Sequence, residues 1–239
     1  MPDFMIYNGV SNHDRGFLVE KLPEEHRPRR LIEQVQIPGR PGRVTEDLGA
    51  YDSFNTNCKI NCFGHAPSEV YAWLRGEGWL TTSQDPDFMR WVSFYDQITD
   101  DRFRLNASGD DCFDTLTIPM TCQPYKYQVQ QEILSFAEPA VFYGKGNENS
   151  APVIKVTGNG SISLMVNGAT VLLDDVTQPI YIDSEALTAY TESGGEKQFA
   201  GRYITIIDDI WPYLEPGSNS INWTGSVSEV EIRPWWRWL

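Results

Sequence analysis

The chain has 239 residues, and 33 acidic against 19 basic side chains give it a net charge of −14. Hydrophobic residues make up 41% of the sequence, which suffices for a packed core and excludes a largely disordered chain. The acidic excess is spread over both halves, so the average field repels duplex DNA and argues against a nucleic-acid-binding protein. No apolar run reaches the ~20 residues that cross a bilayer, and no basic segment precedes an apolar one at the N-terminus. We therefore expect no membrane partner, no secretory signal and folding in a cytoplasm.

Short β-branched and aromatic runs separated by turn residues predict a β domain over residues 1–134. Alternation over residues 51–63 predicts a strand in which Cys58 and Cys62 share one face. Residues 66–75 change to a helical period, with apolar side chains at i, i+3 and i+4 and a glycine after the last turn. The first domain is therefore expected to hold one helix.

An excursion over about residues 21–45 interrupts this domain, and it begins with a charged, proline-bearing stretch at 21–30 that cannot be a regular core element. Two extended runs around the turn Pro38-Gly39-Arg40-Pro41-Gly42-Arg43 predict a projecting hairpin arm, whose edges would need another surface. The arginines concentrated here could bind phosphate, or they could belong to a solvated arm or a contact between subunits. They are Arg27, Arg29, Arg30, Arg40 and Arg43.

Loop-forming residues place a linker at 135–150 and a second domain at 151–239. Asn167-Gly168 between two apolar runs is the strongest hairpin signal in the chain. About seven strand-like runs fit the spacing of a β-sandwich. They lie at 153–156, 162–166, 170–173, 180–182, 203–207, 220–224 and 227–232, with glycine-rich 158–160 as the first break.

No motif of a serine hydrolase, a zinc protease or a phosphate-binding loop occurs, so we predict no enzymatic activity and no cofactor. Adjacent aspartates at 100–101, 110–111, 174–175 and 208–209 could serve a glycosidase or hold calcium. However, neighbouring residues on a strand point to opposite faces, and solvated loops explain these pairs better.

The four cysteines include a Cys58-x3-Cys62 pair followed by His65, which has some resemblance to metal-ligand spacing. Zinc sites usually show two close pairs, whereas Cys112 and Cys122 are far apart in the chain. Buried reduced thiols fit this pattern better, and we predict no metal site.

The C-terminal run Arg233-Pro234-Trp235-Trp236-Arg237-Trp238 has two interpretations. Aromatic faces can stack on sugar rings, or the tail can anchor against a neighbouring domain or subunit. Trp223, Trp235 and Trp236 are therefore candidates for contact with a sugar or a protein partner.

In order along almost the whole chain, these elements resemble the distal tail proteins of long-tailed phages, the Dit or phage tail component family. The segments that carry the resemblance are VQIPGRPGRVTEDLGAYDSFNTNCKI, APSEVYAWLRGEGWL, SAPVIKVTGNGSISLMVNG, PIYIDSEALTAY, IIDDIWPYLEPGSNSINWTG and EIRPWWRW. Their succession is more specific than any one of them. Asp209-Ile210-Trp211-Pro212 departs from the phenylalanine or glycine usual before this proline.

The resemblance implies a mainly β structural hub of the tail tip or baseplate, with six copies in a ring or in stacked rings. The arm would clasp the next subunit through Leu31, Val35, Ile37, Arg40 and Arg43. The C-terminal sandwich would be galectin-like or carbohydrate-module-like. Implied partners are the tail tube protein and a tail-associated lysin, tail fibre or receptor-binding protein.

On this hypothesis DNA passes through the ring without binding, because an acidic bore would repel it. The protein would be assembled in the bacterial host cytoplasm and reside at the virion tail tip, and a phage and a prophage would encode the same scaffold. The alternative is a carbohydrate-binding protein that contacts cell-surface sugars through the C-terminal sandwich.

Overall fold

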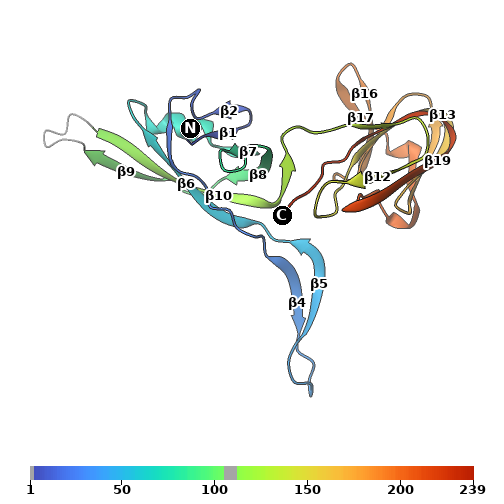
Figure 1. The fold of residues 1–239 in the computed structure, drawn as a ribbon, viewed down its shortest axis with the longest axis horizontal. Helices are drawn as coiled ribbons and strands as arrows, with labels where there is room; N and C mark the ends of the chain where they lie inside the picture. Colours follow the sequence, from blue (N-terminus) through green and yellow to red (C-terminus); the bar gives the residue numbers. More distant parts are fainter. Residues whose placement is uncertain (1–2, 105–111) are drawn as a thin grey trace. The chain divides into compact units, whose positions relative to one another are not determined.

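The computed structural model describes residues 3–104 and 112–239, and the chain divides into two compact units between Val129 and Gln130 (Figure 1). Both units consist mainly of antiparallel β-strands, and each has its own hydrophobic core. In the described part of the chain, no helix is long and apolar enough to span a membrane. The mainly β fold expected from the sequence is confirmed.

The N-terminal unit contains an eight-stranded sheet in the order β2-β1-β7-β8-β10-β6-β3, with β9 paired to β10. Strand β10 is the longest of them; β8 and β9 follow each other along one of its edges, and β6 pairs along the other. The strands are β1 (Met5–Tyr7), β2 (Val10–Ser11), β3 (Leu18–Lys21), β6 (Phe54–Cys62), β7 (Gly76–Thr82), β8 (Phe88–Phe94), β9 (Thr99–Arg104) and β10 (Cys112–Gln128).

The period-two pattern of β6 and β10 builds the core of this unit. In the antiparallel register Leu116 lies opposite Ile60 and Ile118 opposite Cys58, and all four side chains are fully buried. Pro119 lies where β9 has ended and β8 has not yet begun along that edge, so its missing N–H costs no ladder hydrogen bond there.

Helix α1 (Pro67–Trp73) forms where the sequence predicts it. Pro67 occupies the first turn, and the Glu69 carboxylate accepts a hydrogen bond from the Ala66 N–H at 3.1 Å. Val70 and Trp73 are buried against the sheet, so the helix closes one side of the core.

A separate two-stranded hairpin consists of β4 (Arg30–Val35) and β5 (Val44–Tyr51), and Figure 1 shows it extending away from the sheet. It begins later and ends later than the arm expected at 21–45. Residues 22–29 instead pack on the sheet, because Leu22, Pro23 and Pro28 are buried.

The C-terminal unit is built on two long strands, β13 and β19, which pair with each other and carry shorter strands on both sides. The first half of β13 pairs with β15 and its second half with β14, while β11 and β12 pair with opposite ends of β19. The strands are β11 (Leu134–Phe136), β12 (Ala140–Gly144), β13 (Val153–Val166), β14 (Ala169–Val176), β15 (Ile180–Asp183), β16 (Thr188–Ser193), β17 (Glu196–Phe199), β18 (Ile204–Ile206) and β19 (Gly217–Arg233).

The pairing of β13 with β19 shifts register partway along. Both strands continue past these shifts, and residues from both ends of each strand pack in one core. The glycine-rich stretch 158–160, expected as a turn, is therefore an irregularity inside β13, and runs 220–224 and 227–232 are parts of β19. Asn167 and Gly168 do form the predicted hairpin turn between β13 and β14, with φ of 48° and 90°.

The stretch expected as a linker at 135–150 differs from that expectation. Phe136 and Phe142 pack against the C-terminal core and their ring centroids lie 5.1 Å apart. Their strands β11 and β12 pair with β19, so this stretch forms part of the C-terminal unit.

Candidate assembly hairpin and its anchor

The hairpin β4–β5 pairs in an antiparallel register that places Val35 opposite Val44 and Glu33 opposite Glu46. Near its root, β5 carries extra residues around Gly49, whose φ is 74°, so the ladder bulges there. A lone two-stranded hairpin is marginally stable in water. A hairpin that projects in this way gains stability when a further surface covers it.

Exposed apolar side chains occur along the hairpin. Ile32, Val35, Ile37 and Leu48 are 39% to 54% exposed, and Leu31 is half-buried. Of the residues expected at a subunit contact, Arg40 and Arg43 lie exposed at the tip. The structure thus gathers the expected contact residues on one projecting element.

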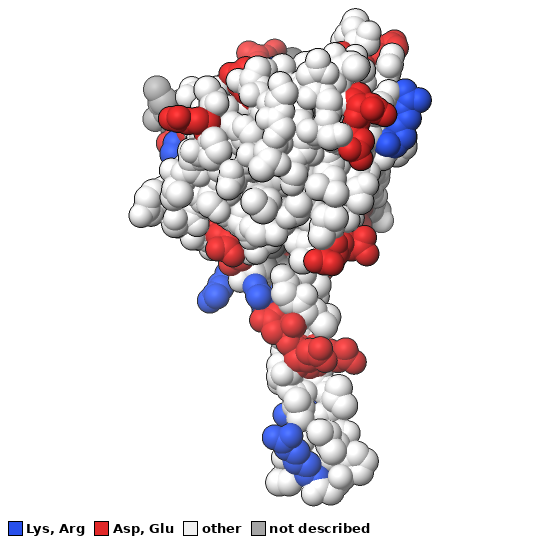
Figure 2. Space-filling view, turned by 90° about the vertical axis from the view of Figure 1, so that its right-hand side faces the viewer, with Lys and Arg blue, Asp and Glu red and all other residues white. Residues whose placement is uncertain are grey.

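Charge along the hairpin is banded (Figure 2). Glu33, Glu46 and Asp47 form a middle acidic band, between Arg40 and Arg43 at the tip and further arginines at the root. Arg30 at the root bonds both Asp47 oxygens at 2.9 and 3.0 Å, and its guanidinium lies 4.6 Å from the Tyr51 ring centroid. This pairing lowers the pKa of the Asp47 carboxyl.

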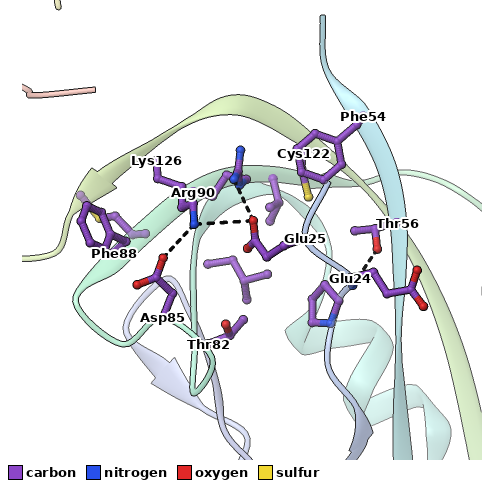
Figure 3. Close-up of a pocket in the computed structure, with 14 residues that line it drawn as sticks. Glu24, Glu25, Phe54, Thr56, Thr82, Asp85, Phe88, Arg90, Cys122 and Lys126 are labelled. Carbon is purple, nitrogen blue, oxygen red and sulfur yellow. Dashed lines mark hydrogen bonds and ion pairs between the residues drawn. The ribbon is translucent and has the colours of Figure 1, made fainter. Parts of the chain in front are cut away.

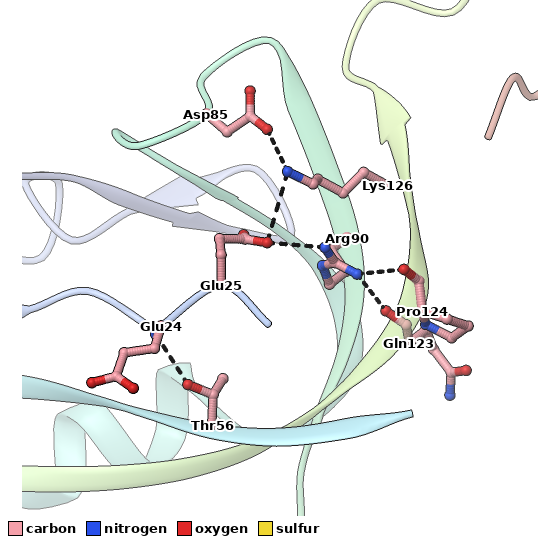
Figure 4. A network of polar contacts seen from close by, with 8 residues as sticks. All are labelled: Glu24, Glu25, Thr56, Asp85, Arg90, Gln123, Pro124 and Lys126. Carbon is pink, nitrogen blue, oxygen red and sulfur yellow. Dashed lines mark hydrogen bonds and ion pairs between the residues drawn. The ribbon is translucent and has the colours of Figure 1, made fainter. Parts of the chain in front are cut away.

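Residues 22–29, which we call the strap, carry the chain from β3 across the sheet to the hairpin. Its backbone is fixed at Glu24, whose N–H donates to the Thr56 hydroxyl at 3.0 Å (Figure 4). The strap's Glu25 carboxylate reaches the buried Arg90 at 3.0 Å. Apolar burial and these polar contacts together hold the root of the hairpin on the sheet.

Arg90 is held by a bulge in β10. Between Cys122 and Lys126 the register with β8 shifts, and the carbonyl groups of Gln123 and Pro124 turn toward the guanidinium. Arg90 donates to them at 2.8 and 2.7 Å, and its guanidinium lies 4.9 Å from the Phe54 ring centroid. The arginine thus satisfies carbonyls that the bulge removes from the ladder.

Lys126 extends this network toward the turn before β8. Its ammonium lies 2.8 Å from Asp85 and 3.7 Å from Glu25, so Glu25 is shared by two cations. Sequence reasoning missed Arg90, Lys126 and Glu25. Pro124 within a long strand run was the available signal of a bulge, but it does not identify the side chain that fills it.

A small hollow lies inside this network, lined by Glu25, Phe54, Arg90, Cys122 and others (Figure 3). Its volume of about 30 Å³ suits one or two water molecules and no substrate. The arrangement is that of a structural anchor.

Burial controls the ionisation of the cysteine thiols. It raises the pKa of Cys58 and Cys122 to about 12 and that of Cys62 to about 11. All three are free and buried, as the sequence favoured, and the Cys112 side chain lies outside the described part. His65 contacts Glu69 at 3.3 Å, and the described residues contain no group of three potential metal ligands.

The adjacent aspartates at 100–101, 174–175 and 208–209 are exposed, and the pair at 110–111 lies outside the described residues. Partial desolvation and the neighbouring Asp114 raise the pKa of Asp100.

The candidate tryptophans occupy different environments in the C-terminal unit. Trp236 is only 3% exposed, belongs to the core and donates its indole N–H to Glu132. Trp223 and Trp235 are half-buried. Trp236 is thus inaccessible to a sugar ring, while the other two retain exposed surface.

A shallow polar groove of about 260 Å³ crosses the outer face of the same unit. Glu231, Lys155, Tyr181 and Tyr190 form one cross-strand row in it. The two tyrosine rings stack with their centroids 5.0 Å apart and 2° between their planes. The Lys197 ammonium lies 4.1 Å from the centroid of the Tyr190 ring, which is buried, so that ring has little surface for stacking.

Comparison with known proteins gives a structural likeness alone. No known family profile matches the chain, and no curated protein matches it significantly. The Dit protein of phage SPP1, described as a paradigm of the hub of the adsorption apparatus in phages infecting Gram-positive bacteria, aligns with a TM-score of 0.74. The alignment covers 100% of both chains at 15% identity, so this chain has the Dit fold.

Two structures of the phage p2 baseplate in its activated conformation, with Ca and with Sr, are also similar at 10% identity. Their TM-scores are 0.48 and 0.44, covering 98% and 97% of this chain and 98% of each baseplate chain. Values below 0.5 add no support to the fold assignment.

Proposed function

We propose that this chain is a structural hub protein of a phage tail tip, six copies of which form a ring joining the tail tube to the adhesion device. The observation that carries the proposal is the Dit fold over the full chain, as in the SPP1 hub protein. The banded, partly apolar hairpin supports it, because such an element needs a second surface.

In this role the N-terminal unit forms the ring, and the tail tube protein binds on one side of it. A lysin, tail fibre or receptor-binding protein binds on the other, and DNA passes through without binding because the chain is strongly acidic. The protein is then assembled in the bacterial cytoplasm and resides in the virion. The role is structural and requires no catalytic centre.

Absolute mass by light scattering over a wide concentration range tests the ring. A particle of six times 27.2 kDa, about 163 kDa, or a stacked pair of such rings is expected, with a central hole in negative-stain images. V35D/I37D in the hairpin should abolish this particle, since both apolar side chains would be buried in it. V141D is the control, because Val141 is also exposed but lies in the C-terminal unit. A monomer at every concentration would contradict the ring.

A second candidate function, binding of cell-surface carbohydrate by the C-terminal unit, has one observation in its favour. The groove on the outer sheet face presents Lys155, Tyr181 and Glu231 side by side, and polar groups of this kind can bond sugar hydroxyls. A glycan array with the full chain should then show binding that Y181A removes. W223A and W235A test the expected tryptophan sites separately, and binding unchanged in all three would place any sugar elsewhere.

A further inference from the structure

The two faces of the hairpin differ in how their charges are neutralised. On one face Ile32 lies opposite Asp47, and Arg30 neutralises Asp47 within the chain. On the other face Glu33 lies directly opposite Glu46, and among the described residues neither has a cation within ion-pair distance. Like charges directly opposite on a ladder destabilise a hairpin.

Next to this acid pair on the same face lies the apolar pair Val35 and Val44. An arginine suits such a surface, because its aliphatic stem can cover the valines while its guanidinium bonds the carboxylates. Two carboxylates on neighbouring strands would accept two guanidinium groups. The face is therefore complementary to a closely spaced arginine pair.

The strap carries such a pair. Arg27 and Arg29 are exposed on either side of buried Pro28, and neither has a carboxylate within ion-pair distance in the described structure. The strap is held on the sheet through Leu22 and Glu25, so the backbone that carries its two arginines is already fixed. A pre-positioned partner loses less conformational freedom on binding.

We propose that the face formed by Glu33, Glu46, Val35 and Val44 binds the strap arginines Arg27 and Arg29 of a second copy of this chain. The contact is head-to-tail, which is the type that closes into a ring. The inference rests on the proposed ring and adds the residues that join its subunits. It also accounts for an acid pair that is unfavourable in the isolated chain.

Charge reversal on the full-length chain tests this contact. E33K/E46K and R27E/R29E should each raise the midpoint concentration of assembly by about tenfold or more at low salt. Combining all four substitutions should restore assembly to within a few-fold of the original, because opposite charges face each other again. E138K/E196K makes the same change of net charge as E33K/E46K, at exposed C-terminal positions, and should have little effect.

A second observable separates this contact from a general loss of folding. In the dissociated chain, E33Q should increase hydrogen-exchange protection of β4 and β5, because the repulsion is removed, while it weakens assembly. A substitution that merely disrupts the hairpin would lower both.

The outcomes distinguish the inference from the ring itself. If the wild-type chain assembles, V35D/I37D blocks assembly and the combined reversal fails to restore it, the ring stands and this contact is wrong. If R40E/R43E together with E33K/E46K restores assembly instead, the acid pair binds the hairpin tip and the strap assignment is overturned. A wild-type chain that never assembles overturns both.

Discussion

Arg90 is a buried cation whose guanidinium bonds two backbone carbonyls at the bulge of β10. Its side chain is 7% exposed, and its partners are two backbone carbonyls and the half-exposed Glu25. A buried guanidinium with all these bonds is tolerated, but removal of the cation leaves carbonyl groups without donors. The residue therefore joins the β10 bulge to the root of the hairpin.

Arg90→Met should lower the free energy of unfolding by about 3 kcal/mol, since buried carbonyls and Glu25 lose their partner. Hydrogen exchange should accelerate in the strap and around the β10 bulge. Arg75→Met removes an exposed arginine and should stay within about 0.5 kcal/mol of the wild type in urea denaturation. Equal stability of the two variants would show that the Arg90 contacts contribute nothing.

The buried cysteines give a second prediction at this scale. A pKa raised from 9.0 to about 12 lowers the thiolate fraction of Cys58 and Cys122 about a thousandfold at pH 8, because burial disfavours the charged form. In a Cys112→Ser background, iodoacetamide should leave the native thiols nearly unmodified for hours and label all three in denaturant. Rapid labelling of the native chain would mean that the core opens.

At the scale of elements, long bent strands rather than separate short ones organise the C-terminal unit. The bend of β13 and β19 depends on Gly158 and Gly225, where a side chain would meet backbone atoms of the opposite strand. Gly225 has a φ of 101°, and an added Cβ would lie 2.4 Å from the Ser161 carbonyl oxygen. Gly160 has a φ of 75° but has open space around it.

This difference allows a matched test. Gly160→Ala should cost about 1 to 2 kcal/mol, from backbone strain alone. Gly225→Ala adds a clash with backbone and should cost about 2 kcal/mol more. Thermal unfolding of both variants checks the difference. Equal melting temperatures would show that the backbone near Ser161 moves away from a Cβ at residue 225 without cost.

The sequence predicted those elements whose backbone conformation is fixed by residues close together in the chain. Asn167-Gly168 specifies its own turn, and Pro67 with Glu69 specifies the start of α1. Gly158 and Gly160 were expected to end a strand. In the structure β13 instead continues through them and pairs with β19 both before and after this irregularity. The anchor of the hairpin depends on a bulge far along the chain, so the hairpin could be expected from the sequence and Arg90 could not.

At the scale of the whole molecule, each unit has a separate core. The boundary after Val129 defines which segments a fragment must contain to keep one core intact. Phe136 and Phe142 pack against the C-terminal core, and both lie before the domain start expected at residue 151. A fragment cut at that expected boundary would lose two strands that cover edges of β19.

A fragment of residues 130–239 should therefore unfold in one cooperative thermal transition. A fragment of residues 151–239 should be less stable by at least about 3 kcal/mol, because two strands and two aromatic side chains that pack on the core are missing, and should aggregate through the uncovered edge of β19. Phe142→Ala in the longer fragment removes one of those rings while keeping both strands, so its stability should lie between the two. If the shorter fragment were as stable as the longer one, β11 and β12 would be appendages, and the C-terminal core would be complete without them.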